Sequence, residues 1–393
     1  MRFATLIKKF LRSLLQRRKT TMRSGSTPLW QCAATGKRMT NKFPRKIVVR
    51  CPNWVGDLVM CTPSLRSLRQ HFVNAHITIM VKPSLRPVVE QLPFFDDIIE
   101  YEPKGRDRGW WRYWSVVKTL RQKQFDLGIL MPHSFSSALL FFLSGIPERA
   151  GYNRNARGWL LTHKLSPIRV QGVRVPVNMV ELYLELVRSL GCKDSDKRIE
   201  LKTSPAAEQW AADFFARQGI KDTDLIIVII PGATFGSSKC WQDGSFAAVA
   251  DALINEYGAK VIIIPGPGEL AIARSIIQKM KRIPIGIDDQ VLPLDLLMAL
   301  IQRCSLLITN DTGPRHFGVA FDKPVIVIMG PTDSRYTDYQ LELTRIIKEP
   351  VSCAPCHLKE CPTDHRCMTL ITPEKVLAAA RDIINQQYPA RAC

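Results

Sequence analysis

Short apolar runs rich in β-branched residues alternate with stretches of helical spacing, and this alternation occurs in both halves of the chain. The runs are continuous rather than alternately apolar and polar, which is typical of strands buried on both faces of a parallel sheet. Strands that alternate with helices indicate doubly wound α/β domains. The expected strands are residues 46–51, 76–81, 97–101 and 127–130, then residues 225–230, 260–265, 306–310 and 324–329.

The sequence therefore predicts an α/β fold with two doubly wound, Rossmann-like parallel sheets. A chain of 393 residues is long enough for two domains of roughly 150 residues each. The expected helices lie near residues 58–72, 111–124, 246–257, 270–279, 294–303 and 373–387. The expected organisation is a basic extension (1–45), a first domain (46–200), a second domain (201–372) and a C-terminal helical segment packed at the domain junction (373–393), with the polar stretch 193–205 as linker.

The positive charge of the chain is concentrated at its N-terminus. The formal net charge is +20, and the first 50 residues contain 14 Lys and Arg and no Asp or Glu. Helical spacing over the first 15 residues places apolar side chains on one face and basic ones on the other, which indicates an amphipathic helix suited to an anionic membrane surface. An unstructured leader, or translation that starts at Met39, is the alternative interpretation.

Several classes of protein are not expected. No apolar run approaches the roughly 18 residues that a membrane-spanning helix needs. The extension lacks the apolar core and cleavage site of a secretory signal. Basic residues outside the extension are scattered and no known nucleic-acid module is visible, so a nucleic-acid partner is not expected. We expect a cytoplasmic protein, either soluble or peripheral at a membrane.

Polar motifs directly follow the expected strands, where parallel sheets bind their ligands. After the first strand, Asn53 begins a strand-to-helix turn that ends in Asp57. An Asp at a helix start is commonly a cap, but in a cleft it could also act as a general base. After residues 225–230, Thr234, Ser237 and Lys239 offer hydroxyls and a cation to an anion, although a plain polar loop is the alternative.

Two further motifs belong to the second half. Glu269 follows the strand at 260–265 and could contact a ribose or sugar hydroxyl, or simply carry the negative charge favoured at a helix N-terminus. After residues 306–310, Asp311, Thr312 and Gly313 form a turn into a helix. Arg315 and His316 add two side chains able to carry positive charge, so this turn predicts an anion site.

Together these motifs resemble glycosyltransferase family 9, the heptosyltransferases of lipopolysaccharide core synthesis. The resemblance rests on NWVGDLVMCTPSLRSLR, PGATFGSSKCW, NDTGPRHFGVA and KPVIVIMGPT, together with residues 137–162, and it extends over about residues 46–387. It implies a GT-B fold with an N-terminal acceptor domain and a C-terminal nucleotide domain. It also implies an ADP-heptose donor, an inner-core heptose on Kdo–lipid A as acceptor, inversion at the anomeric carbon and no metal requirement.

The family's residue roles carry over onto matching positions. By resemblance, Asp57 is the general base, Lys239 holds the diphosphate with Thr234 and Ser237 nearby, and Glu269 contacts the nucleoside. Asp311 contacts the heptose, and Thr312, Gly313 and His316 contact the phosphates. On the acceptor side we expect Asn53, and we hypothesise that Arg149, Arg154 and Arg157 bind acidic sugars or phosphates; solvated surface arginines are the alternative.

Four cysteines cluster near the C-terminus, at Cys353, Cys356, Cys361 and Cys367. A structural zinc site, free thiols and disulfides are the three interpretations that the spacing leaves open.

The favoured function is an inverting heptosyltransferase that is peripheral on the cytoplasmic face of the inner membrane. Two alternatives remain at this stage: another GT-B transferase with a different nucleotide sugar or glycan acceptor, and a non-catalytic protein that binds nucleotide sugars. The presence of both Asp57 and Lys239 argues against the second alternative.

Overall fold

The computed structural model describes residues 43–102, 110–167, 169–170, 173–193, 196–287, 289–340 and 342–388. Residues 1–42, nearly all of the basic extension, lie outside these ranges, so the amphipathic helix and its alternatives stay predictions.

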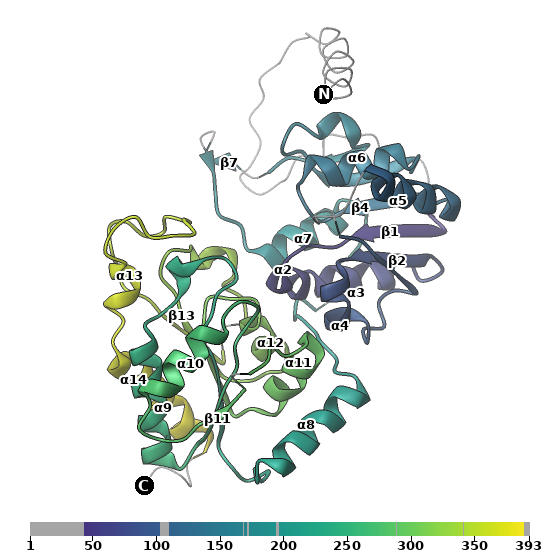
Figure 1. The fold of residues 1–393 in the computed structure, drawn as a ribbon. Helices are drawn as coiled ribbons and strands as arrows, with labels where there is room; N and C mark the ends of the chain where they lie inside the picture. The colour runs from purple at the N-terminus through teal and green to yellow at the C-terminus, as the bar shows by residue number, and fades with distance from the viewer. Residues whose placement is uncertain are drawn as a thin grey trace. The chain divides into compact units, whose positions relative to one another are not determined.

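The first half contains a six-stranded parallel sheet in the order β3-β2-β1-β4-β5-β6 (Figure 1). Its strands are β1 (Lys46–Arg50), β2 (His76–Val81), β3 (Asp97–Glu100), β4 (Leu127–Leu130), β5 (Glu148–Tyr152) and β6 (His163–Leu165). The antiparallel pair β7 (Arg169–Val170) and β8 (Val173–Arg174) follows. The helices are α2 (Val55–Met60), α3 (Thr62–His71), α4 (Arg86–Val89), α5 (Trp110–Lys123), α6 (Phe135–Leu143) and α7 (Met179–Arg188), with short 3-10 turns η1 (Pro83–Leu85) and η2 (Gly158–Leu160).

The second half repeats this arrangement with the parallel order β11-β10-β9-β12-β13-β14. Its strands are β9 (Ile226–Ile230), β10 (Lys260–Ile263), β11 (Ile285–Gly286), β12 (Leu306–Asn310), β13 (Val325–Ile328) and β14 (Thr344–Ile347). Its helices are α8 (Pro205–Arg217), α9 (Asp243–Tyr257), α10 (Leu270–Lys279), α11 (Leu294–Arg303), α12 (Arg315–Ala320), α13 (Arg366–Thr369) and α14 (Pro373–Gln387), with η3 (Ser237–Lys239) and η4 (Ser334–Tyr336).

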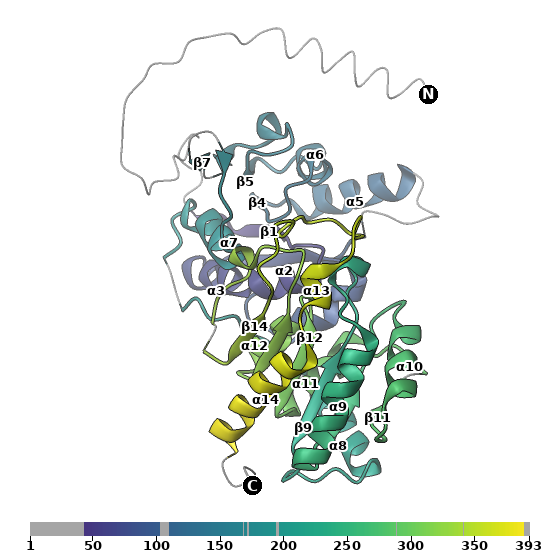
Figure 2. The same cartoon turned by 90° about the vertical axis from the view of Figure 1, so that its left-hand side faces the viewer.

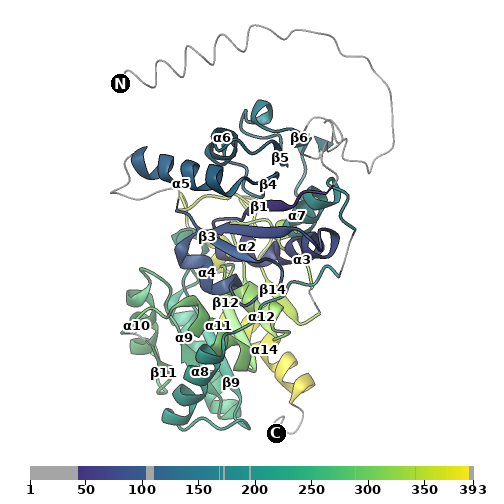
Figure 3. The ribbon, with the colours of Figure 1, turned by 90° about the vertical axis from the view of Figure 1, so that its right-hand side faces the viewer.

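Helices cover both faces of each sheet, as the doubly wound prediction requires. In the first half α2, α3 and α7 pack on one face, while α5 and α6 pack on the other (Figure 3). In the second half α8, α11 and α12 cover one face, and α9, α10 and α14 cover the other. The two halves meet through α2 against α12 and α4 against α11.

The C-terminal helix has the expected bounds, but its expected place at the domain junction is wrong. It lies beside α9 and contacts β13 and β14 (Figures 1 and 2). The reason is its apolar stripe, which enters the core of the second sheet and consists of Val376, Leu377, Ala380, Ile383 and Ile384.

All eight expected strands are present, whereas the expected helix at 58–72 is divided into α2 and α3 at Cys61. Within the described residues, no helix is long and apolar enough to cross a membrane.

Candidate active site

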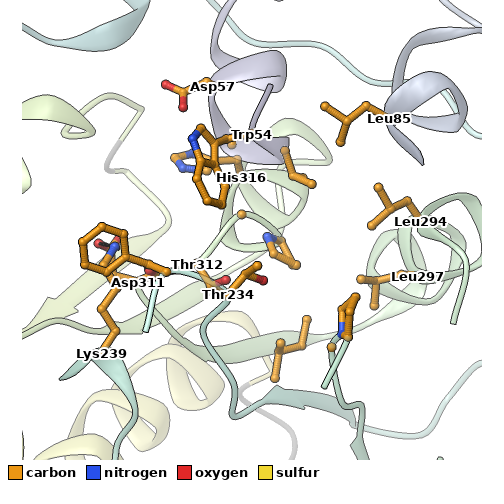
Figure 4. Close-up of a pocket in the computed structure, with 18 of the residues that line it drawn as sticks. Trp54, Asp57, Leu85, Thr234, Lys239, Leu294, Leu297, Asp311, Thr312 and His316 are labelled. Atoms are coloured by element: carbon orange, nitrogen blue, oxygen red, sulfur yellow. Dashed lines mark hydrogen bonds and ion pairs between the residues drawn. The ribbon is translucent and has the colours of Figure 1, made fainter. Parts of the chain in front are cut away.

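One pocket of about 1010 Å³ is lined by both halves of the chain (Figure 4). It brings together nine of the residues singled out from the sequence: Asn53, Asp57, Thr234, Lys239, Glu269, Asp311, Thr312, Gly313 and His316. Ser237 begins η3, two residues before Lys239, but does not line the pocket. The carboxyl ends of β1, β9, β10 and β12 therefore deliver their polar loops to one place, as parallel sheets do.

Asp57 lies in the first turn of α2, just after β1, and the OH of Tyr183 donates a hydrogen bond to its Oδ1 at 3.2 Å. Burial raises the pKa of Asp57 above its ordinary value, and the hydrogen bond from Tyr183 and the charge of Lys239 partly oppose this. The N-cap position belongs to Trp54, so the capping interpretation of Asp57 is wrong. A buried carboxylate with a raised pKa is well suited to accept a proton.

The adjoining loop of Asn53 is held by a buried cation. Arg50 is almost fully buried, and its guanidinium donates to the side-chain oxygen of Asn53 and to the carbonyl oxygens of Cys51 and Met80. This arrangement fixes the turn between β1 and α2, from which both Asn53 and Asp57 reach the pocket.

Asp311 lies at the centre of an ionic network in the second half. Lys239 Nζ donates to its Oδ2 at 2.6 Å and to its carbonyl oxygen at 3.0 Å. Arg315 Nη1 donates to Oδ1 at 2.7 Å, and the Thr332 hydroxyl donates to Oδ2 at 2.6 Å. The two cations hold the pKa of Asp311 well below its usual range despite its burial. Asp311 is therefore ionised and keeps Lys239 at the pocket wall.

His316 of the second half lies against Gly56 of the first half. Its Nδ1 is 2.6 Å from the hydroxyl of Tyr339, and the two rings stack. A Cβ atom added at Gly56 would lie 2.6 Å from Cδ2 of His316. Burial, with the charge of Arg315, holds the pKa of His316 well below its ordinary value. This direction favours the neutral imidazole.

Glu269 precedes α10 and is nearly buried, and its Oε2 accepts the backbone N–H of Gly266 at 2.9 Å. Burial raises the pKa of this carboxyl. A Cβ atom at Gly232 would overlap the carboxylate, so a larger residue at that position would displace the side chain of Glu269. Leu85, Leu294 and Leu297 line the pocket on the side away from Asp57, Lys239 and Asp311 (Figure 4). The pocket thus has a charged end and an apolar end.

The arginines of the first half do not line the pocket. Arg149 donates through Nε to the carbonyl of Leu160 and packs over the ring of Phe142, while the guanidinium of Arg154 lies over the ring of Tyr152. The fully buried Arg157 donates to the carbonyl oxygens of Tyr152, Pro132 and Ser134.

Arg157 has no surface to offer a ligand, so both its acceptor role and its description as a surface residue are corrected. For Arg149 and Arg154 the acceptor role stays a prediction.

The four clustered cysteines are free thiols, with Cys353 and Cys356 exposed and Cys367 buried. Among the described residues, no group of three or more His, Cys, Asp or Glu side chains is placed to hold a metal ion, which corrects the zinc interpretation. The segment instead supports the loop of Lys239. Ser238 N donates to the carbonyl of Lys359 at 3.0 Å, and His365 Nε2 is 2.6 Å from the carbonyl oxygen of Ser238.

Sequence reasoning missed Arg50, Tyr183 and Tyr339, which support the site from behind, and it gave no role to Thr332, which lines the pocket. Thr332 stands in a polar loop that follows an expected strand, which is a usable signal. Tyr183 is in α7 and meets Asp57 across 126 positions of sequence, so no local pattern could have placed it.

Two doubly wound parallel sheets that share one cleft form the GT-B fold. The model of glycosyltransferase family 9 (heptosyltransferase) matches residues 113–366. The chain belongs to this family and is a glycosyltransferase.

Individual relatives agree with the family assignment. The chain is 26% identical over 359 residues to lipopolysaccharide heptosyltransferase 2 of Escherichia coli K12, with 87% of this chain and 99% of the relative covered. It is 29% identical over 307 residues to lipooligosaccharide heptosyltransferase 2 of Haemophilus ducreyi, with 74% and 85% covered.

Solved structures share the fold. A glycosyl transferase family 9 protein from Veillonella parvula matches with a TM-score of 0.74 and 24% identity, covering 89% of this chain and 99% of its own. The ADP-heptose LPS heptosyltransferase II of E. coli matches with a TM-score of 0.71 and 24% identity, covering 87% and 99%.

Proposed function

We propose that this enzyme transfers heptose from ADP-heptose to the heptosyl-Kdo inner core of lipopolysaccharide, with inversion at the anomeric carbon. The observation that carries the proposal is the meeting of Asp57, from the first half, with the Lys239–Asp311 pair, from the second, in one pocket. Family membership and relatives named lipopolysaccharide and lipooligosaccharide heptosyltransferase 2 support the choice of sugar and acceptor.

In the proposed reaction an acceptor hydroxyl attacks the anomeric carbon of the donor. Its oxygen forms the new glycosidic bond, its proton passes to the carboxylate of Asp57, and the bond from the anomeric carbon to the diphosphate breaks to release ADP. The raised pKa of Asp57 favours proton acceptance. Lys239 stabilises the charge that grows on the leaving diphosphate, in a pocket where fixed charges act more strongly than in water. No metal is needed for this step.

The donor would lie mainly against the second half, residues 201–372. Its diphosphate would share Lys239 with Asp311 and lie near Thr234, Ser237, Thr312 and Gly313. Its adenosine would extend toward Glu269 and the apolar end of the pocket, because an aromatic base gains from burial against Leu294 and Leu297. The acceptor would enter from the first half, residues 46–200, past Asn53.

The enzyme would work as a peripheral protein on the cytoplasmic face of the inner membrane, because its proposed acceptor is anchored there by lipid A. The basic residues of the N-terminal extension favour an anionic surface.

A donor panel tests the proposal. Purified enzyme is given ADP-heptose, ADP-glucose or UDP-glucose together with a Kdo–lipid A acceptor that bears one heptose, in buffer with EDTA. We expect ADP release and a product heavier by one heptose with ADP-heptose, at a rate that EDTA does not change. Turnover with ADP-glucose or UDP-glucose but not with ADP-heptose would overturn the assignment of ADP-heptose as the donor. Binding of the donor without turnover would favour the alternative of a non-catalytic protein that binds nucleotide sugars.

A further inference from the structure

The outer surface of helices α5 and α6 exposes large aromatic side chains. Trp111, Trp114, Phe142 and Trp159 expose between 37% and 75% of their surface. Burying such side chains would normally be favourable, so their exposure in a group indicates a surface that meets a partner.

These aromatic residues belong to one layer of the fold. The helices α5 and α6 and the turn η2 bury their inner sides in a single cluster against the first sheet, and the two helices are neighbours in Figures 1 and 3. On the outside, Trp159 of η2 contacts the ring of Phe142 with a centroid distance of 5.9 Å. The guanidinium of Arg149 lies over the ring of Phe142, 5.4 Å from its centroid.

Helical spacing extends this cluster along α5. Trp111, Trp114, Lys118 and Arg121 are separated by three, four and three positions, so they form one stripe on the helix. The stripe adjoins α6, because Arg121 Nε donates to the carbonyl of Leu143 at 2.9 Å. We call the set Trp111, Trp114, Lys118, Arg121, Phe142 and Trp159 the aromatic–basic face.

The charged residues of helices α5 and α6 are all basic. Helix α5 contains four Lys and Arg and no acidic residue, and α6 contains no charged residue. Tryptophan gathers at membrane–water interfaces, where its ring enters the headgroup region and its N–H stays hydrated. Lys and Arg beside it attract anionic lipids.

One end of the aromatic–basic face, at Trp111 and Trp114, lies at the carboxyl edge of the sheet. Because α2, α5 and α6 each follow a parallel strand, their N-termini lie at the carboxyl edge of the first sheet. Asp57 is in the first turn of α2, and Trp111 and Trp114 are in the first turns of α5. A surface that bound these tryptophans would therefore run beside the edge from which Asp57 works.

We propose that the aromatic–basic face docks on an anionic lipid surface and so presents the catalytic pocket to its lipid-anchored acceptor. The lipid-anchored acceptor in this inference comes from the proposed function. A second copy of this chain is the less suitable occupant, because a two-fold interface would bury Lys118 and Arg121 of both copies between helices α5 and α6, which contain no acidic residue to pair with them.

The test is vesicle binding by the full chain. Flotation with phosphatidylcholine vesicles, with and without about one third phosphatidylglycerol, compares wild type with the triple variant Trp114→Ser, Phe142→Ser and Trp159→Ser. The matched control replaces three exposed apolar residues elsewhere, Val73→Ser, Ile283→Ser and Leu370→Ser. Thermal melting confirms that the variants are folded, and Lys118→Glu serves as a second probe that removes no apolar surface.

We expect the triple variant to weaken binding to anionic vesicles by about tenfold or more, and the control triple to bind as wild type. Lys118→Glu should reduce the preference for anionic vesicles. Unchanged binding by the aromatic triple would overturn the proposal, as would a dimer in sedimentation that only the aromatic triple dissociates.

A water-soluble acceptor without its acyl chains distinguishes a loss of membrane docking from a loss of catalysis. The aromatic triple should turn over this acceptor at the wild-type rate and lose activity only on vesicles. Absence of turnover on the soluble acceptor by wild type itself would count against the proposed function and not against the docking face.

Discussion

At the residue scale, the side chain of Asp57 is ionisable but lies where water solvates it poorly. Asp57 is buried and its pKa is raised, so its ionised form is less stable in the folded protein than in the unfolded chain. The contribution of Asp57 to the free energy of unfolding therefore stabilises the folded protein at acid pH, and it is lost as the pH rises through the folded-state pKa of Asp57. Such a cost to stability at neutral pH is typical of functional carboxylates.

Removal of the Tyr183 hydroxyl should change the pKa of Asp57. The OH of Tyr183 donates to Asp57 and stabilises its ionised form. Tyr183→Phe should therefore raise the pKa of Asp57 further and move the acid limb of kcat/KM to higher pH, by about one unit. The pH profiles of wild type and variant measure this. An unmoved acid limb would show that another group controls proton transfer.

Asp311 should behave in the opposite way. Two cations lower its pKa, so its contribution to stability is present at neutral pH and is lost as the pH falls through its depressed pKa. Asp311→Ala leaves Lys239 and Arg315 buried without their counter-charge and should cost about 3 kcal/mol in urea denaturation. Arg381→Ala breaks an exposed pair with Glu256 and should change stability little. Equal effects of the two substitutions would contradict the structural role given to Asp311.

At the scale of elements, buried parallel strands were predictable because their continuous β-branched runs are a strong local signal. The strands β5, β6, β11 and β14 were missed, because they are shorter or less apolar; β5, for example, reads ERAGY. The loops of Asp57, Lys239 and Asp311 could be assigned to one cleft because each follows a central strand. What the sequence could not reveal is the packing partner of each element, as with Tyr183 behind Asp57 or α14 against α9.

The contact of α2 with α12 offers a test at this scale. Because a Cβ atom at Gly56 would overlap His316, Gly56→Ala should displace α2, which carries Asp57, relative to α12. A displacement of about 1 Å can cost roughly a hundredfold in rate, so kcat should fall by more than the KM for donor rises. Gly244→Ala is the control, since no atom lies within 4 Å of its added Cβ. Activity of Gly56→Ala equal to that of the control would show that this contact does not position the base.

At the scale of the whole molecule, two similar sheets contribute different chemistry to one pocket. The first half supplies a proton acceptor and the second supplies cations that hold an anion. An inverting displacement needs these groups on opposite sides of the reacting carbon, and two separate domains can provide that separation.

The most direct test of this division is turnover by Asp57→Asn. The substitution keeps the size of the side chain and removes its ability to take a proton, while Lys239 and its partners stay in place. Wild type and variant are mixed with ADP-heptose and a Kdo–lipid A acceptor bearing one heptose, and ADP release, product mass and ADP affinity are measured. We predict a loss of about a thousandfold in kcat with ADP affinity unchanged. A variant that retained most of the wild-type rate would contradict the assignment of Asp57 as the base.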